Sequence, residues 1–176
     1  MADLKQALKD CGALQFGDFT LASGAKSKYY IDIKRASTDP KVLKLIAEGM
    51  AKGLKEQGLK VDRIAGIVLG SVPLAAALSL ETGIPYVMVR KEKKDHGTGK
   101  LIEGVLNSGD KVLVVEDVIT SAGSSVKGIA TLREEGAVVE NVFSVIDREA
   151  GGSDALAAIG VKLTPLVKAS DLLKGQ

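Results

Sequence analysis

The 176-residue chain lacks the residues that several common kinds of site require. A single cysteine, Cys11, excludes an internal disulfide and a zinc site built from cysteines. The only histidine, His96, excludes a metal site built from paired histidines. Tryptophan is absent and the aromatic residues are three Phe and three Tyr, too few for a surface that stacks single-stranded nucleic acid. The net charge of +2 is also too small for a general nucleic-acid-binding protein.

We expect neither a targeting segment nor a membrane span. Residues 1–10 are charged throughout and lack the apolar centre of a signal peptide. Residues 64–80 carry no charge, but this stretch is shorter than a membrane helix and Gly70, Ser71 and Pro73 interrupt it. We therefore predict a buried strand, a turn and a core helix there, in a protein of the cytoplasm.

From residue 63 onward, short apolar runs alternate with helical patterns. The patterns predict strands over 64–68, 85–89, 111–115, 138–146 and 162–166, and helices over 72–82, 124–135, 153–159 and 169–173. This alternation is typical of an α/β fold, in which a mostly parallel twisted sheet is flanked by helices. Ligands of such sheets bind beyond the carboxyl ends of the strands, so the loops at those ends are the candidates for a site.

The N-terminal third reads differently. We predict a helix over 2–10, two short strands over 19–21 and 29–33, and a helix that follows Asp39 as its N-cap and runs to about residue 57. On its own pattern, the segment 16–35 is also consistent with a small edge hairpin that carries an aromatic cluster.

The strongest signal lies in Lys111–Ser125, KVLVVEDVITSAGSS. A buried strand leads to two adjacent carboxylates, Glu116 and Asp117, and then to small hydroxyl-bearing residues that open a helix. Backbone N–H groups and a helix N-terminus favour a phosphate there, whereas the carboxylates suit sugar hydroxyls or a cation. We interpret the segment as a ribose-5-phosphate site. The alternative is a capped helix after a core strand, with two exposed acids.

A second candidate is the segment 90–104, RKEKKDHGTGKLIEG, which is rich in cations and glycines. Groups of this kind can stabilise a departing pyrophosphate, and a closing loop can exclude water. By itself the segment also fits a solvated surface loop.

These motifs resemble a known family. The hydrophobic–acid–acid–Val–Ile–Thr–small–small–Gly run resembles the phosphoribosyl pyrophosphate (PRPP) signature of type I phosphoribosyltransferases. The RKxxKxHG pattern, met by Arg90, Lys91, Lys94 and His96, resembles the catalytic loop of orotate phosphoribosyltransferases. The resemblance covers about residues 16–148. It implies one domain over 1–176, with a small N-terminal hood over about residues 1–38.

The implied activity is transfer of the 5-phosphoribosyl group from PRPP to orotate. The products are orotidine 5′-monophosphate and pyrophosphate, and the step belongs to de novo pyrimidine (UMP) biosynthesis. The catalytic roles fall on Arg90, Lys91, Lys94 and His96. PRPP binding falls on the acid pair Glu116 and Asp117 and on the loop Thr120, Ser121, Ala122, Gly123, Ser124 and Ser125.

The resemblance also implies the contacts to the base, the cofactor and a partner. Orotate would contact Thr120, Tyr30 and Arg148, because an arginine at a strand end can clamp a carboxylate; without the family, Arg148 also fits a surface salt bridge. Mg²⁺ is implied, held mainly by PRPP with no dedicated protein ligands. A homodimer is implied, in which the segment 90–104 reaches the neighbouring subunit's site.

The chain departs from the family pattern at two positions, and two rivals to the implied function remain. Lysines that members of the family carry are replaced here by Ala22 in the hood and by Gly70 in the loop after the first core strand, and Lys26 is a candidate to replace the former. The rivals are a phosphoribosyltransferase for another base and a PRPP-sensing transcription regulator on the same fold. Arg148 argues against the first, and the lack of a DNA-binding element in the first 15 residues argues against the second.

Overall fold

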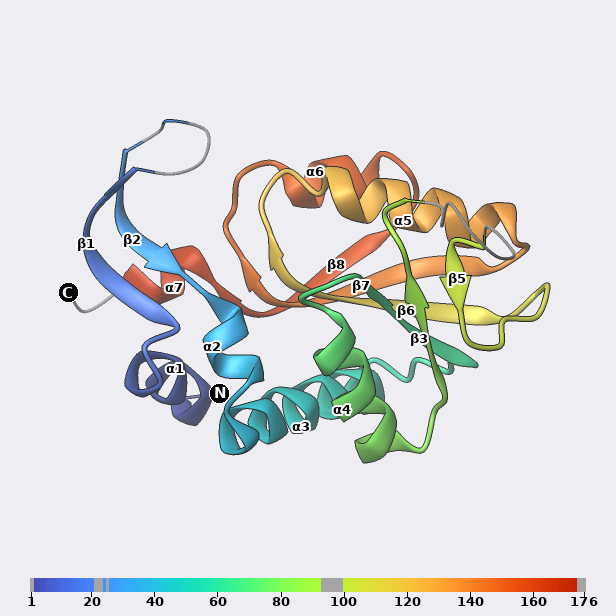
Figure 1. Cartoon of the computed structure of the whole chain (residues 1–176), viewed down its shortest axis with the longest axis horizontal. Helices are drawn as coiled ribbons and strands as arrows, with labels where there is room; N and C mark the ends of the chain where they lie inside the picture. Colours follow the sequence, from blue (N-terminus) through green and yellow to red (C-terminus); the bar gives the residue numbers. More distant parts are fainter. Residues whose placement is uncertain (1, 21–23, 25, 93–99, 174–176) are drawn as a thin grey trace.

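A six-stranded sheet forms the centre of the computed structural model, which describes residues 2–20, 24, 26–92 and 100–173. The strand order is β5-β4-β3-β6-β7-β8 (Figure 1). The bounds are β3 (Arg63–Ile67), β4 (Tyr86–Val89), β5 (Ile102–Glu103), β6 (Lys111–Ile119), β7 (Val138–Asp147) and β8 (Lys162–Lys168). All neighbours pair in parallel except β4 and β5. The predicted mostly parallel α/β fold is confirmed.

Helices cover both faces of the sheet, with α3 and α4 on one side and α5 and α6 on the other (Figure 1). Their bounds are α3 (Pro40–Glu56), α4 (Val72–Thr82), α5 (Gly123–Glu134) and α6 (Gly152–Ala157). Strand β6 shows why both faces are needed: Leu113 and Val115 pack into the core beneath α3 and α4, whereas Val112 and Val114 pack into the core beneath α5. Because alternate side chains point to opposite faces, an all-apolar strand must be covered twice.

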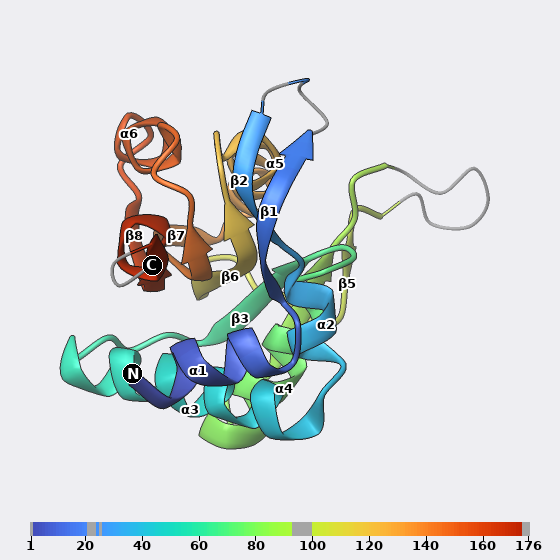
Figure 2. The same ribbon diagram turned by 90° about the vertical axis from the view of Figure 1, so that its left-hand side faces the viewer.

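The N-terminal region adds a hairpin that is separate from the main sheet (Figure 2). Strands β1 (Leu14–Thr20) and β2 (Lys26–Ile31) pair antiparallel, with an irregularity between Phe16 and Phe19. Helix α1 (Ala2–Asp10) precedes the hairpin and packs beside α3, and the short helix α2 (Ile33–Ser37) follows it. The last helix, α7 (Ala169–Leu173), follows β8 directly.

Local signals explain where the helices begin. Asp39 accepts hydrogen bonds from the backbone N–H groups of Lys41 and Val42, and Pro40 occupies the first turn of α3, as predicted. The uncharged stretch 64–80 forms β3, a turn and most of α4. None of the helices in the described ranges is long and apolar enough to cross a membrane.

Several predicted boundaries are wrong. Strand β6 continues to Ile119 instead of ending at residue 115, because β7 pairs with it along this whole length and leaves the acid pair inside the strand. The hairpin strands begin at Leu14 and Lys26, earlier than predicted. Helix α2 and strand β5 were not predicted, since five and two residues are too short for a periodic pattern. Strand β5 lies within the predicted loop 90–104.

The close approach of α4 to β3 depends on Gly66. A Cβ added there would lie 2.8 Å from the carbonyl oxygen of Ser71 and 3.0 Å from the Ala75 Cβ. We expect Gly66→Ala to push α4 away from β3 and to lower the free energy of unfolding by about 1–3 kcal/mol. Urea denaturation measures this change.

Gly49→Ala is the matched control for that substitution. Its Cβ would meet only the Leu166 side chain, at an ordinary 3.4 Å. Because Ala is the better helix former, Gly49→Ala should leave stability unchanged or raise it by up to about 1 kcal/mol. Equal losses in both variants would contradict the packing account.

Candidate active site

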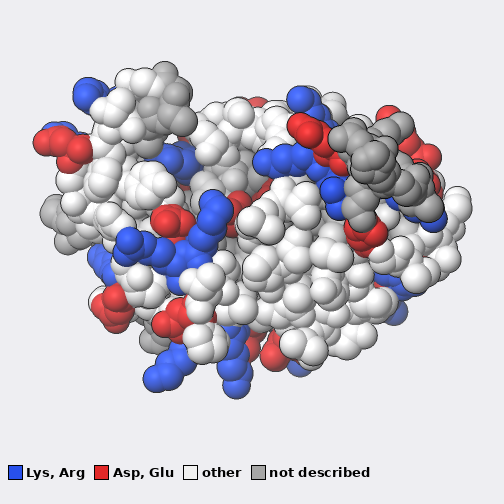
Figure 3. All heavy atoms as spheres, in the orientation of Figure 1, with Lys and Arg blue, Asp and Glu red and all other residues white. Residues whose placement is uncertain are grey.

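Four of the predicted site residues, Lys91, Glu116, Asp117 and Ser124, line one cavity at the carboxyl edge of the sheet. This cavity of about 230 Å³ opens between the loop after β3, strand β6 and the first turn of α5. Figure 3 shows basic side chains around a hollow between the hairpin and the rest of the molecule. The residues that line the cavity are Lys34, Ile67, Val68, Leu69, Gly70, Ser71, Lys91, Glu116, Asp117, Val118 and Ser124.

Glu116 is the buried centre of this site. Its side chain is 5% exposed, and its two carboxylate oxygens accept hydrogen bonds from Ser71 Oγ at 2.5 Å and from Ser125 Oγ at 2.6 Å. Ser71 precedes α4 and Ser125 lies in the first turn of α5, so the carboxylate joins both helices to β6. Each oxygen keeps a further lone pair, so Glu116 can still accept a hydrogen bond from a ligand.

Burial raises the pKa of Glu116 above its ordinary value of 4.5. The hydrogen bonds from Ser125 and Ser71 and the charge of Lys91 oppose this shift, and the neighbouring charge of Asp117 adds to it. Desolvation is the largest cause, because a carboxylate loses more hydration here than two hydroxyls return. The folded state therefore holds this charge against an energetic penalty.

Asp117, the second member of the acid pair, is half-buried and also lines the cavity. Its Oδ1 accepts a hydrogen bond from the Val118 N–H at 2.8 Å, and its Oδ2 faces Gly70. A Cβ at position 70 would overlap that oxygen. A side chain at position 70 therefore requires the Asp117 side chain to move.

The predicted phosphate loop, residues 120–125, leads from β6 into α5. Thr120, Ser121, Gly123 and Ser124 are exposed, and Ala122 has a left-handed backbone with φ 63°. Ala122 is also the N-cap of α5, so no side chain caps the helix there. The backbone N–H groups in the first turn of α5 are therefore not capped by a side chain. Together with the helix dipole, they favour the binding of an anion. The hydroxyl of Ser125 is engaged by Glu116, which leaves its backbone as the possible contact.

Arg148 lies next to the phosphate loop, since its N–H donates to the Ile119 carbonyl at 2.9 Å. Its guanidinium lies 5.1 Å from the centre of the Tyr29 ring, within the range of a cation–π contact. The predicted base contacts Thr120 and Arg148 are therefore neighbours. Tyr30, the third predicted contact, lies beside Phe19 at 5.6 Å between ring centres, on the other face of the hairpin from Tyr29.

The structure describes the two ends of the predicted catalytic segment 90–104, which are residues 90–92 and 100–104. The Arg90 guanidinium lies 3.6 Å from Glu103 Oε1, and Lys91 lines the cavity close enough to act on the charge of Glu116. Arg90 and Lys91 also border a neighbouring cavity of about 360 Å³ over α5. Lys94 and His96 lie outside the described residues, as does Ala22.

Three residues at the site were missed by sequence reasoning. Ser71 carried a signal, because a serine before a helix has a hydroxyl to donate. Tyr29 could have been found from the alternation of β2, which places Tyr29 and Tyr30 on opposite faces. Lys34 carried no signal, because α2 was not predicted. Lys26, the candidate to replace a lysine at position 22, donates to Thr20 Oγ1 at 2.7 Å within the hairpin.

Metal ligands are sparse in the part of the chain that the structure describes. It contains no group of three or more His, Cys, Asp or Glu side chains that could hold a metal ion. The acid pair is the carboxylate donor set at the cavity. A divalent cation that arrives with its own oxygen ligands would fit such a pair.

Comparisons with known proteins show the family to which the chain belongs. Residues 35–159 match the model of the phosphoribosyl transferase domain. The chain is 54% identical over 172 residues to an orotate phosphoribosyltransferase of Methanosarcina mazei, covering 98% of this chain and 91% of that protein.

Solved structures give the same result. The orotate phosphoribosyltransferase of Aeropyrum pernix superimposes with a TM-score of 0.88 at 33% identity, covering 97% of this chain and 96% of that one. The Mycobacterium tuberculosis enzyme in complex with 5-phospho-alpha-D-ribosyl 1-diphosphate (PRPP) has a TM-score of 0.81 at 29% identity, covering 97% of each chain.

The buried charge of Glu116 predicts a pH-dependent gain in stability for Glu116→Gln. A raised pKa means that the folded state releases its proton later than the unfolded state, so wild-type stability falls as pH rises from the ordinary value of 4.5 through the folded pKa. The glutamine removes this loss. The advantage of Glu116→Gln in free energy of unfolding should therefore grow as pH rises from 4.5 through the folded pKa, as measured by urea denaturation at a series of pH values.

Glu140→Gln makes the same chemical change at an exposed position of β7 and serves as the control. It should show no comparable growth with pH. A Glu116→Gln variant whose advantage stays constant or shrinks as pH rises would contradict the assigned burial penalty.

Proposed function

The chain belongs to the orotate phosphoribosyltransferases of the phosphoribosyl transferase domain family, and from this premise we propose that it transfers the 5-phosphoribosyl group of PRPP to orotate. The bond between C1 of the ribose and the pyrophosphate oxygen breaks, a bond from C1 to the orotate ring nitrogen forms, and that nitrogen releases its proton to the solvent. The products are pyrophosphate and orotidine 5′-monophosphate, the precursor of UMP in de novo pyrimidine biosynthesis.

One observation carries this proposal: the acid pair lies in a single cavity between the phosphate loop and the loop after β3. PRPP has the same order of groups, with a ribose between a 5-phosphate and a diphosphate. We assign the 5-phosphate to residues 120–125, where free N–H groups open α5. The ribose hydroxyls are assigned to Glu116 and Asp117, which accept hydrogen bonds and repel phosphate.

The base is assigned to Thr120 and Arg148, which follow the paired ends of β6 and β7 next to the phosphate loop. A guanidinium presents two parallel N–H donors, which match the orotate carboxylate. The cation–π contact with the Tyr29 ring would help to hold the guanidinium in place. Tyr30, on the other face of β2, remains assigned to orotate from the family resemblance.

The chemistry needs no covalent protein nucleophile. We propose an oxocarbenium-like transition state at C1, with negative charge growing on the departing pyrophosphate. Arg90, Lys91, Lys94 and His96 are assigned to that charge, because fixed donors aimed at developing charge account for much of enzymatic rate enhancement. Lys91 lines the cavity, which supports its assignment.

We also propose Mg²⁺ as the cofactor. Bound together with PRPP, the metal would screen the charge of the diphosphate. Asp117 and Glu116 would hold this complex by accepting hydrogen bonds from the ribose hydroxyls. The proposal further includes a homodimer that shares the segment 90–104 between subunits, and a location in the cytoplasm, where a chain with one cysteine needs no disulfide.

The direct test follows orotate by its ultraviolet absorbance in the presence of PRPP and Mg²⁺. We expect the absorbance to fall rapidly, the reaction to stop without Mg²⁺, and Lys94→Ala to lower the rate by about 100- to 1000-fold. A panel with uracil and adenine identifies a different base. Rapid loss of another base but not of orotate would refute the proposal, and full activity of Lys94→Ala would remove this residue from the mechanism.

Arg148 should contribute to the recognition of orotate and not to the binding of PRPP. Removing one partner of a desolvated charge pair leaves the other uncompensated, so Arg148→Ala should lower kcat/KM for orotate by about 100-fold. Arg148→Lys keeps the charge but loses the paired donors, and should recover only part of the activity. Steady-state kinetics with each substrate varied in turn measures both effects. An equal increase of KM for PRPP and for orotate would contradict the assignment.

A further inference from the structure

A lysine from outside the recognised motifs lines the cavity. Lys34 belongs to α2 and borders the same space as Gly70, Ser71 and the acid pair. Together with Lys91, it is one of two basic side chains in the described lining of this cavity. The two lysines come from different parts of the chain, Lys34 from α2 and Lys91 from the segment after β4.

The packing of α2 directs Lys34 away from the core. Ile33, Ala36 and Ser37 are buried, which sets the inner face of this short helix. The side chain of Asp32 accepts a hydrogen bond from the Lys34 backbone N–H at 3.2 Å and caps the helix. Lys34 is thereby left on the outer face, and its position follows from the backbone of α2.

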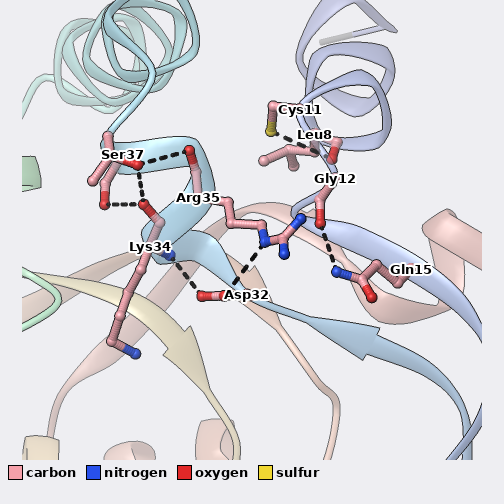
Figure 4. Close-up of polar contacts among 9 residues, drawn as sticks. Leu8, Cys11, Gly12, Gln15, Asp32, Lys34, Arg35 and Ser37 are labelled. Carbon is pink, nitrogen blue, oxygen red and sulfur yellow. Dashed lines mark hydrogen bonds and ion pairs between the residues drawn. The ribbon is translucent and has the colours of Figure 1, made fainter.

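The neighbouring cation, Arg35, leaves the helix in another direction. Its guanidinium lies 3.9 Å from a carboxylate oxygen of Asp32, whereas the Lys34 side chain extends away from that pair (Figure 4). Among the residues that the structure describes, no carboxylate forms an ion pair with the Lys34 ammonium. Lys34 therefore borders the cavity without an ion pair that would compete with a ligand for its charge.

The loop after β3 has no cation of its own to offset the negative charge of a bound diphosphate. Residues 67–71, Ile-Val-Leu-Gly-Ser, contain no cation, and a side chain at position 70 would displace Asp117. Glu116 and Asp117 repel any anion bound beside this loop. A diphosphate there is stable only if cations outside the loop offset its charge and that of the acid pair.

We propose that Lys34 binds the diphosphate of PRPP and of the pyrophosphate product, supplying the positive charge that the loop around Gly70 lacks. This inference rests on the proposed function. It assigns Lys34 to the diphosphate, because Lys34 and the loop after β3, which has no cation, line the same cavity. The 5-phosphate has its own donors at the start of α5.

Calorimetric titration of inorganic pyrophosphate, with Mg²⁺ present, tests the proposal on the full chain. Lys34→Ala should raise the Kd for pyrophosphate by about 10- to 100-fold, as expected for loss of a charge-assisted hydrogen bond. Lys34→Arg should retain most of the affinity. Lys41→Ala, which removes an exposed lysine from α3, is the matched control and should bind like the wild type.

Ribose 5-phosphate provides the second readout, because it lacks the diphosphate. Its Kd should be unchanged in Lys34→Ala, and in turnover the KM for PRPP should rise while the KM for orotate stays constant. Wild-type affinity of Lys34→Ala for pyrophosphate, or equal weakening of pyrophosphate and ribose 5-phosphate, would overturn the role of Lys34 and leave the proposed function intact. Failure of the wild type to bind either ligand would overturn both.

Discussion

The carboxylate of Glu116, held between two serine hydroxyls, is the interaction on which the site depends. Ser71 and Ser125 belong to different helices, and the carboxylate fixes both relative to β6. This arrangement keeps a charge in a place where burial opposes ionisation. A neutral residue would suit the core better, so the charge is retained at the expense of stability. We attribute it to function, because strained or poorly solvated groups concentrate at active sites.

Charges of opposite sign enter the site from different parts of the fold. The acids come from inside a central strand, whose position is fixed by neighbours on both sides. The cations come from the periphery: Lys34 from α2 and Lys91 from the segment after β4. The uncharged donors come from the start of α5. In the proposed binding mode, the phosphate, hydroxyl and diphosphate groups of PRPP each meet one of these three sets.

Much of this could be predicted from the sequence, because the relevant signals are local. The phosphate loop follows from small and hydroxyl residues placed between an apolar strand and a helix, and the strand–helix alternation predicts the parallel sheet. The acid pair was found, but its place inside β6 was not, because pairing with β7 extends the strand through two polar residues.

The rest required the tertiary structure. Lys34 and Gly70 are far apart in the sequence, and only the topology places them at one cavity. The contact of Tyr29 with Arg148 likewise joins the hairpin to the end of β7. Gly70 is the clearest case: from the sequence it is a missing cation, whereas the structure shows that Asp117 occupies the space a side chain would need.

A crystal structure of the chain with PRPP and Mg²⁺ tests the central claim most directly, because that claim concerns the orientation of one ligand in one cavity. The account predicts the 5-phosphate on the N–H groups of residues 120–125, the ribose hydroxyls at Glu116 and Asp117, and the diphosphate between Gly70 and Lys34. A PRPP molecule bound in the reverse orientation, or outside this cavity, would contradict it.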